Sequence, residues 1–315
     1  MRTPSPVLVP LVAVFSLMMF LLCAIRPADA GQVITDNIRQ WARQAVDEER
    51  SASFKPAANT VAVLYFHNNT RQPQLDFLQM GMAVMLITDL SKVKEIQVVE
   101  RARLQALIQE LKLGASGLVA GETAPRMGRL LGARYLVGGD LNGNGKDAVS
   151  IDSDLINVPD KGVLGRPTTS GPLDEILQME KGILFDIIRL LRLELTESQK
   201  KELRKPFTRN IKALMYLVQG LQYSDRGAYD EAAVQYRRAL KLDPGLQPAR
   251  SAVGELEDLG LISPLPPGNV LLNNVRDRVS VNRSPIPGQL TKRHQSEPAS
   301  VLGPAGSSAD VRVQW

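Results

Sequence analysis

The order of apolar and polar positions divides the chain into four regions. Residues 7–25 form an uncharged apolar run, and residues 34–196 alternate between strand-type and helix-type spacing of apolar positions. Residues 209–258 show helix-type spacing only, and residues 262–315 are rich in Pro, Ser, Asn and Gly without periodicity. We therefore expect an α/β region, then a small all-α region, and then a disordered tail.

Four strands are predicted inside the α/β region. Residues 60–66 (TVAVLYF) are almost wholly apolar, which is typical of a strand buried on both faces, and Asn68-Asn69-Thr70 is expected to end it. Shorter or alternating apolar patterns predict three more strands, and the Asn and Gly residues after the third predict a hairpin turn. These three strands are expected at residues 96–99, 134–141 and 148–158, and the turn at residues 142–145.

Helices are predicted between and after these strands. Thr35 or Asp36 is expected to cap the first helix, Gly114 to end the third, and Thr123 to cap the fourth. A run of charges at residues 200–205 predicts a solvated linker helix. Strands alternate with helices in the first part of this region, and the later strands are expected to pair as hairpins. This order predicts a two-layer or three-layer α/β sandwich with a mixed sheet. The expected helices cover residues 34–50, 75–91, 100–113, 123–131 and 173–195.

The first thirty residues predict export. Arg2 precedes the apolar run, and Ala28-Asp29-Ala30 is the small-residue site at which a secretory signal peptide is cleaved. The run of 19 residues is also long enough to span a bilayer, so a retained anchor stays open, as does lipidation at Cys23. In each case the rest of the chain is expected in the periplasm.

Composition argues against most kinds of catalysis. The chain has one Cys and two His, too few for a disulfide within the chain or for a Cys/His zinc site. His67 and His294 are the only histidines, and neither has a carboxylate or nucleophile at a recognisable spacing, so His67 is expected to be a polar loop residue. Aromatic residues make up 5% of the chain, which disfavours binding of single-stranded nucleic acid. We expect no enzyme, no metal and no cofactor.

One acidic motif resembles part of a calcium loop. Asp140-x-Asn142-x-Asn144-Gly145 matches its first half, but Ile151 occupies the position where the loop needs a bidentate Glu. The Asn-Gly pair therefore favours an ordinary hairpin turn.

The all-α region resembles a tetratricopeptide repeat, whose two antiparallel helices approach through small residues. The tyrosines are expected to fill the space between the helices, Gly227 to permit the turn and Pro244 to end the second helix. A single repeat must stack on something, either the helix at 173–195 or another copy of the chain. The positions that carry this resemblance are Tyr216, Gly220, Tyr223, Gly227, Tyr229, Ala232, Tyr236, Ala239 and Pro244.

The α/β region, residues 34–196, resembles the CsgG family of curli secretion lipoproteins and the related FlgO and TolB N-terminal domains. The resemblance implies a periplasmic domain of outer-membrane-associated assembly machinery. It is carried by two segments of the chain, whose residues are Val98, Val99, Glu100 and Arg101, then Gly132, Ala133, Tyr135 and Gly138.

The family also includes an oligomeric pore, whose subunits add two membrane-crossing hairpins. The gaps at residues 66–75, 142–147 and 159–172 are too short to hold such hairpins. We therefore expect a scaffold or adaptor in the assembly or export of a cell-surface structure, acting by protein–protein binding. Its expected partners are cell-envelope proteins or a second copy, with membrane association that is peripheral or runs through the N-terminal segment. The alternative is a subunit of an oligomeric outer-membrane secretion channel.

Overall fold

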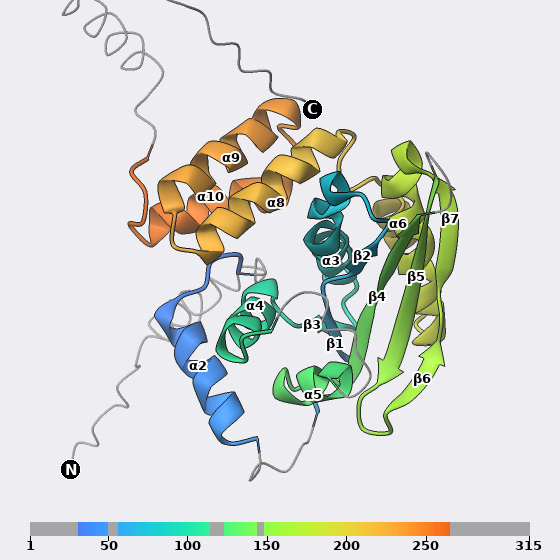
Figure 1. Cartoon of the computed structure of the whole chain (residues 1–315). Helices are drawn as coiled ribbons and strands as arrows, with labels where there is room; N and C mark the ends of the chain where they lie inside the picture. The colour runs from blue at the N-terminus through green and yellow to red at the C-terminus, as the bar shows by residue number, and fades with distance from the viewer. Residues whose placement is uncertain (1–30, 50–55, 114–122, 144–147, 265–315) are drawn as a thin grey trace, which may run out of the picture. The chain divides into compact units, whose positions relative to one another are not determined.

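The computed structural model of the chain describes residues 31–49, 56–113, 123–143 and 148–264 (Figure 1). These residues all belong to one compact unit. The α/β region and the all-α region predicted from the sequence therefore share one body, and the apolar core runs through both. The predicted tail lies outside the described residues from residue 265 onward.

A mixed sheet forms the centre of the α/β region. Its main path runs β3-β1-β4-β5-β6, while β2 pairs with β4 and β7 pairs with β5. The pairings β1–β3, β1–β4 and β2–β4 are parallel, and those of β5 with β4, β6 and β7 are antiparallel. The predicted mixed α/β fold is thus confirmed. The strands are β1 (Thr60–Val63), β2 (His67–Asn69), β3 (Gln97–Val98), β4 (Tyr135–Gly143), β5 (Ala148–Asn157), β6 (Gly162–Gly165) and β7 (Thr168–Pro172).

Three local predictions about the strands are wrong. The strand expected at residues 60–66 ends at Val63, and the chain pairs with β4 a second time as β2, which places His67 and Asn68 in a strand. Asn142 belongs to β4, because the antiparallel ladder with β5 continues through Gly143. The remaining turn residues, 144 and 145, lie outside the described part of the chain.

Strands β6 and β7 were not predicted from the sequence. Both are mostly exposed, and their sequences GVLG and TTSGP lack an apolar face. Backbone pairing to β5 holds both strands in place, and this pairing requires no particular side chains. Their sequences therefore show no hydrophobic periodicity from which a strand could be predicted.

The helices of the α/β region lie close to their predicted places. The Thr35 hydroxyl caps α2 by accepting the N–H of Ile38, as one of the two predicted caps. The helix expected at 173–195 is shorter, because it follows a 3₁₀ turn and gives way to a left-handed residue at Arg192. Gly114 lies outside the described residues, and Thr123 is already helical. The helices are α2 (Asp36–Asp47), α3 (Phe77–Leu90), α4 (Arg101–Glu110), α5 (Thr123–Leu130), α6 (Ile176–Leu190) and α7 (Glu197–Leu203).

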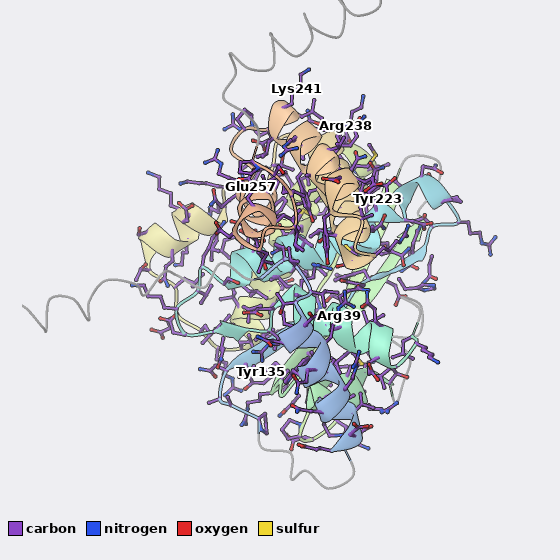
Figure 2. All side chains as sticks on the ribbon, turned by 90° about the vertical axis from the view of Figure 1, so that its left-hand side faces the viewer. Arg39, Tyr135, Tyr223, Arg238, Lys241 and Glu257 are labelled. Atoms are coloured by element: carbon purple, nitrogen blue, oxygen red, sulfur yellow. The ribbon has the colours of Figure 1, made fainter. Side chains whose placement is uncertain are left out.

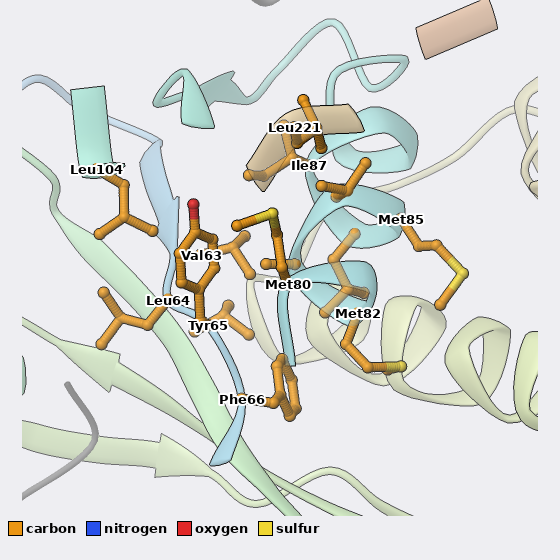
Figure 3. Close-up of a cluster of buried hydrophobic side chains, with 14 of the residues drawn as sticks. Val63, Leu64, Tyr65, Phe66, Met80, Met82, Met85, Ile87, Leu104 and Leu221 are labelled. Atoms are coloured by element: carbon orange, nitrogen blue, oxygen red, sulfur yellow. The ribbon is translucent and has the colours of Figure 1, made fainter. Parts of the chain in front are cut away.

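Helices cover both faces of the sheet near β1 and one face near β5. All four residues of β1 are buried, with Leu64 and Leu104 on one side of the strand and Met82 and Met85 on the other (Figure 3). Residues of β5 alternate between buried and half-buried, and α6 packs against β5 and β7. The sandwich therefore has three layers at its parallel half and two at its antiparallel half.

Three helices follow α7 and extend the core. They are α8 (Ile211–Asp225), α9 (Tyr229–Leu242) and α10 (Gln247–Asp258). Helices α8 and α9 form an antiparallel pair, α10 packs on α9, and α8 packs on α3 of the α/β region (Figure 1). Within the described ranges, no helix combines the length and apolar character needed to cross a membrane.

Candidate functional site

Arg101, the last residue of the predicted Val98–Arg101 motif, lies at the junction between the α/β region and the helices that follow it. It is the first residue of α4 and its side chain is 1% exposed. Its Nη1 donates to Asp225 Oδ2 at 3.0 Å and to the Tyr65 hydroxyl at 3.1 Å. Its Nη2 donates to Asp225 Oδ1 at 2.9 Å and to the Gln32 carbonyl at 2.6 Å. This residue therefore joins four separate segments.

Burial and neighbouring charges set the protonation states of Arg101 and Tyr65. Burial is the largest single influence and disfavours the charged form of Arg101, but the Asp225 carboxylate and the Tyr65 and Tyr236 hydroxyls together outweigh burial and raise the guanidinium pKa. Burial also raises the pKa of Tyr65 to about 12, so its hydroxyl stays protonated at neutral pH. Neither Arg101 nor Tyr65 exchanges a proton near neutral pH, so the hydrogen bonds between them serve as structural contacts.

The second predicted motif segment connects α5 to β4. Gly132 adopts a left-handed conformation with φ of 65°, which ends the helical turn, and Ala133 is fully buried behind it. Tyr135 begins β4, half-buried under the Arg134 guanidinium, and Gly138 is buried in the same strand. These residues position the sheet and carry no reactive group.

The residues of the predicted tetratricopeptide signature lie on α8, α9 and the turns beside them. Gly220 permits the closest approach, because a Cβ at this position would lie 2.4 Å from the Tyr236 ring. Ala232 and Ala239 are fully buried on α9, and Gly227 adopts φ of 79° in the turn between the helices. The other signature residues are Tyr216, half-buried beneath Arg238, Tyr229 at the start of α9, and Pro244 in the turn after α9.

Tyr223 does not fill the space between these helices, contrary to prediction. The residue is 37% exposed, on the outer surface (Figure 2). The buried face of α8 runs through Leu217, Leu221 and Ser224, and position 223 lies at the edge of that face. Tyr223 is therefore accessible to the solvent.

His67 also differs from its prediction. The strand pairing of β2 with β4 sets it opposite Asp140, and its Nδ1 lies 3.5 Å from Asp140 Oδ1. Asp140 could not be identified from the sequence as the partner of His67, because 73 positions separate the two residues. Both side chains are about one-third exposed or more, and Asp140 also accepts a hydrogen bond from Asn69. Among the described residues, no group of three or more His, Cys, Asp or Glu side chains could hold a metal ion.

An apolar groove of about 660 Å³ lies where the starts of α3, α6 and α8 meet. Ile211, the first residue of α8, belongs to the lining and is 37% exposed. Arg209 and Lys212 add two positive charges to the lining, against one negative charge from Asp174. The groove was not predicted, because its walls come from three distant segments. Its apolar lining is Leu75, Phe77, Leu78, Pro172, Leu173, Leu177, Ile211 and Met215.

Residues 42–179 match the family described as "Curli production assembly/transport component CsgG". The matched range holds every strand of the described sheet and ends in the first turn of α6. The chain therefore carries a CsgG-like domain, and the resemblance predicted from its two motif segments is confirmed at that level. The helices α8 to α10 lie beyond the match.

Several solved structures resemble part of the chain. The LpoB C-terminal domain from Salmonella enterica is 17% identical, with a TM-score of 0.30, over 43% of this chain and 98% of that one. Lipoprotein GNA1162 from Neisseria meningitidis is 14% identical, with a TM-score of 0.34, over 44% of this chain and 99% of that one. At these identities the likeness concerns the fold alone.

A curated relative is the "Putative adenylate cyclase 3" of Rhizobium meliloti (strain 1021). The two sequences are 25% identical over 204 residues, which is 63% of this chain and 32% of that protein. This chain thus spans about a third of the length of the curated relative that it matches.

Proposed function

We propose that this protein is a non-enzymatic scaffold or adaptor of the bacterial cell envelope, which binds other proteins during assembly or export of a cell-surface structure. The CsgG-like domain supports this proposal, because the family is described by curli assembly and transport. The reactive groups described above form structural contacts, while the groove offers a surface for binding. A binding role therefore suits the molecule better than catalysis.

The groove is the observation that carries the proposal. Clefts lined by apolar side chains with a few polar groups are the usual form of binding sites. The two basic residues of the lining favour an acidic partner over a basic one. We infer that the occupant is an amphipathic segment of an envelope protein, with apolar side chains in the groove and acidic ones near Arg209 and Lys212.

Helices α8 and α9 are proposed to be a tetratricopeptide unit that stacks on the α/β domain instead of on further repeats. Contact between α8 and α3 supports this arrangement, since it supplies the neighbour that a single repeat needs. The start of α8 then forms one wall of the groove.

Residues 1–30 are proposed to direct export to the periplasm and to be removed after Ala30. Lipidation at Cys23 or retention as an anchor would give the same compartment with firmer attachment to a membrane. The mature chain would then contain no Cys, which suits an oxidising compartment.

Quantitative capture from envelope extracts tests the groove. The bait variants are Ile211→Glu, which adds a charge to the groove, and Val234→Glu, which adds one to a 44% exposed position of α9 outside the groove lining. We expect the wild type and Val234→Glu to enrich the same protein, and Ile211→Glu to lose it about tenfold or more, because the added carboxylate replaces an apolar contact, must be desolvated on binding and repels the acidic side chains of the partner. Equal enrichment by all three baits, or none by the wild type, would overturn the proposal.

Light scattering of the protein extracted from the envelope tests the channel alternative. An adaptor is expected to be a monomer or a small oligomer that is released without detergent. A large ring that requires detergent would replace the adaptor proposal by that of a secretion channel.

A further inference from the structure

The first described residues of the chain are buried and hydrogen-bonded to the rest of the molecule. Gln32, Val33 and Ile34 are all buried, although only Gly31 separates them from the proposed cleavage site. The ends of domains are normally poorly ordered unless specific contacts tie them down. The contacts made by this segment therefore need an explanation.

Two charged side chains form hydrogen bonds with the backbone of this segment. The Glu255 carboxylate, on α10, accepts the N–H of Gln32 at 2.8 Å and that of Val33 at 3.3 Å. From the other side, the buried Arg101 donates to the Gln32 carbonyl. The segment is thus seated between α4 of the CsgG-like domain and α10 of the helical region.

Gly31 lies between two carboxylates. A substituent in the Cβ direction of Gly31 would lie 3.6 Å from Glu255 Oε1 and 3.7 Å from Glu100 Oε2. Glu100 is otherwise paired only with the half-exposed Arg103, at 3.8 Å, among its described ion pairs. Burial, and to a smaller extent the repulsion from Glu100, raises the pKa of Glu255, although the two backbone N–H groups and Arg101 oppose this effect. A further cation between the two carboxylates would relieve the repulsion.

We propose that Glu100 and Glu255 form a binding site for the α-ammonium group of Gly31, which exists only after residues 1–30 have been removed. This inference rests on the proposed signal peptide. In the uncleaved chain the nitrogen of Gly31 is an uncharged amide bonded to Ala30. After cleavage it is an amine with a pKa of about 8, and it carries a positive charge at neutral pH.

The freed nitrogen can reach both carboxylates by a single rotation. Turning the Cα–C bond of Gly31 by about 120° moves the nitrogen into the Cβ direction, since the substituents of a tetrahedral carbon exchange places and their bonds have similar lengths. That direction ends within ion-pair distance of Glu255 and of Glu100. Processing of the N-terminus would then strengthen the joint between the CsgG-like domain and the helical region.

The test compares two forms of the full mature chain. One begins at Gly31 with a free amine, and the other begins at Ala30, so that its ammonium group is displaced by one residue. Both are made from cleavable fusions that leave no extra residue, and their stabilities are measured by urea unfolding. At pH 6.5 we expect the folding equilibrium constant of the Gly31 form to be larger by about fivefold, the upper range for a partly exposed ion pair.

The pH dependence has a definite sign. The folded state holds the ammonium between two carboxylates and so raises its pKa, which makes the added stability complete below about pH 7.5 and lost as the pH rises through the folded-state pKa. The two forms should therefore converge above about pH 9.5. Equal stability at pH 6.5, or a difference that persists unchanged at high pH, would overturn the proposal.

A matched pair of variants identifies the carboxylates. Glu100→Gln should reduce the difference between the two forms, whereas Glu95→Gln, at an exposed position of a nearby turn, should leave it unchanged. A difference unaffected by Glu100→Gln would overturn the assignment of Glu100. Mass spectrometry of the N-terminal peptide from the native envelope protein tests the processing step separately: a Gly31 amine supports it, and a retained or lipidated N-terminus contradicts it. Because Ile211 lies in another part of the molecule, failure here and failure of the groove proposal can be distinguished.

Discussion

Arg101 and Asp225 are 124 positions apart in the sequence and form a buried ion pair with two hydrogen bonds, of 2.9 and 3.0 Å. Arg101 begins α4 of the CsgG-like domain, and Asp225 is the last residue of α8. The pair fixes both the distance and the angle between these helices, because a guanidinium and a carboxylate bind in a fork of defined geometry. It therefore sets how the helical region is held on the domain.

Asp225→Asn is expected to lower the free energy of unfolding by about 3–5 kcal/mol, because it leaves the Arg101 charge buried without its partner. Urea unfolding measures the effect. The matched control is Asp154→Asn, which breaks an Arg–Asp pair with Arg166 whose side chains are 46% and 72% exposed. The control should change stability by less than about 1 kcal/mol. Equal effects of the two substitutions would show that the Arg101–Asp225 joint is not energetically important.

Gly220→Ala should destabilise the protein by about 1–3 kcal/mol, although alanine normally favours a helix. The added Cβ would lie 2.4 Å from the Tyr236 ring, so that α8 and α9 must move apart. Gly254→Ala on α10 is the control, because nothing lies within 4 Å of its added Cβ. It should stabilise the protein by up to about 1 kcal/mol, and thermal unfolding of both variants checks the opposite signs. Stabilisation by both would mean that the contact with Tyr236 yields easily.

Glu180 on α6 is buried in a cluster with Asp89, Lys92 and Lys181. Lys181 donates to Asp89, and its Nζ lies 3.2 Å from Glu180 Oε2. Neither carboxylate oxygen of Glu180 has a partner with hydrogen-bond geometry in the described part of the chain. Burial, with a smaller contribution from Asp89, raises the pKa of Glu180 to about 8, although Lys181 and Lys92 act in the opposite direction.

The wild-type protein should therefore lose stability as the pH rises from about 4.5 to about 8. In this window the folded state holds a proton on Glu180 that the unfolded state releases, which makes unfolding more favourable at higher pH. Glu180→Gln removes this dependence. The free energy of unfolding of the variant, relative to that of the wild type, should therefore rise with pH in this window by at most about 1.4 kcal/mol per pH unit. The raised pKa of Lys181 acts only near and above its usual value of 10.5, outside the window. Parallel stability curves for the two proteins between pH 5 and 8 would contradict the assignment.

Local sequence patterns predicted most helices and the buried strands, because each of these elements has an apolar face with its own periodicity. The strands β6 and β7 have no such face and are held by backbone pairing to β5. Contacts between residues that are distant in the sequence were not predicted either, because no local pattern connects Arg101 with Asp225, or His67 with Asp140. The tyrosines of the helical region show the same limit, since burial of Tyr236 and exposure of Tyr223 depend on the helix packed beside each ring.

The groove exists only where three helix starts meet. Its walls come from the start of α3 and the turn before it, from the start of α6 with the turn before it, and from α8, so a chain in which the helical region has not yet docked presents no such surface. A partner that recognises the groove would therefore distinguish finished molecules from folding intermediates. Binding of such a partner would begin only after the whole molecule has folded.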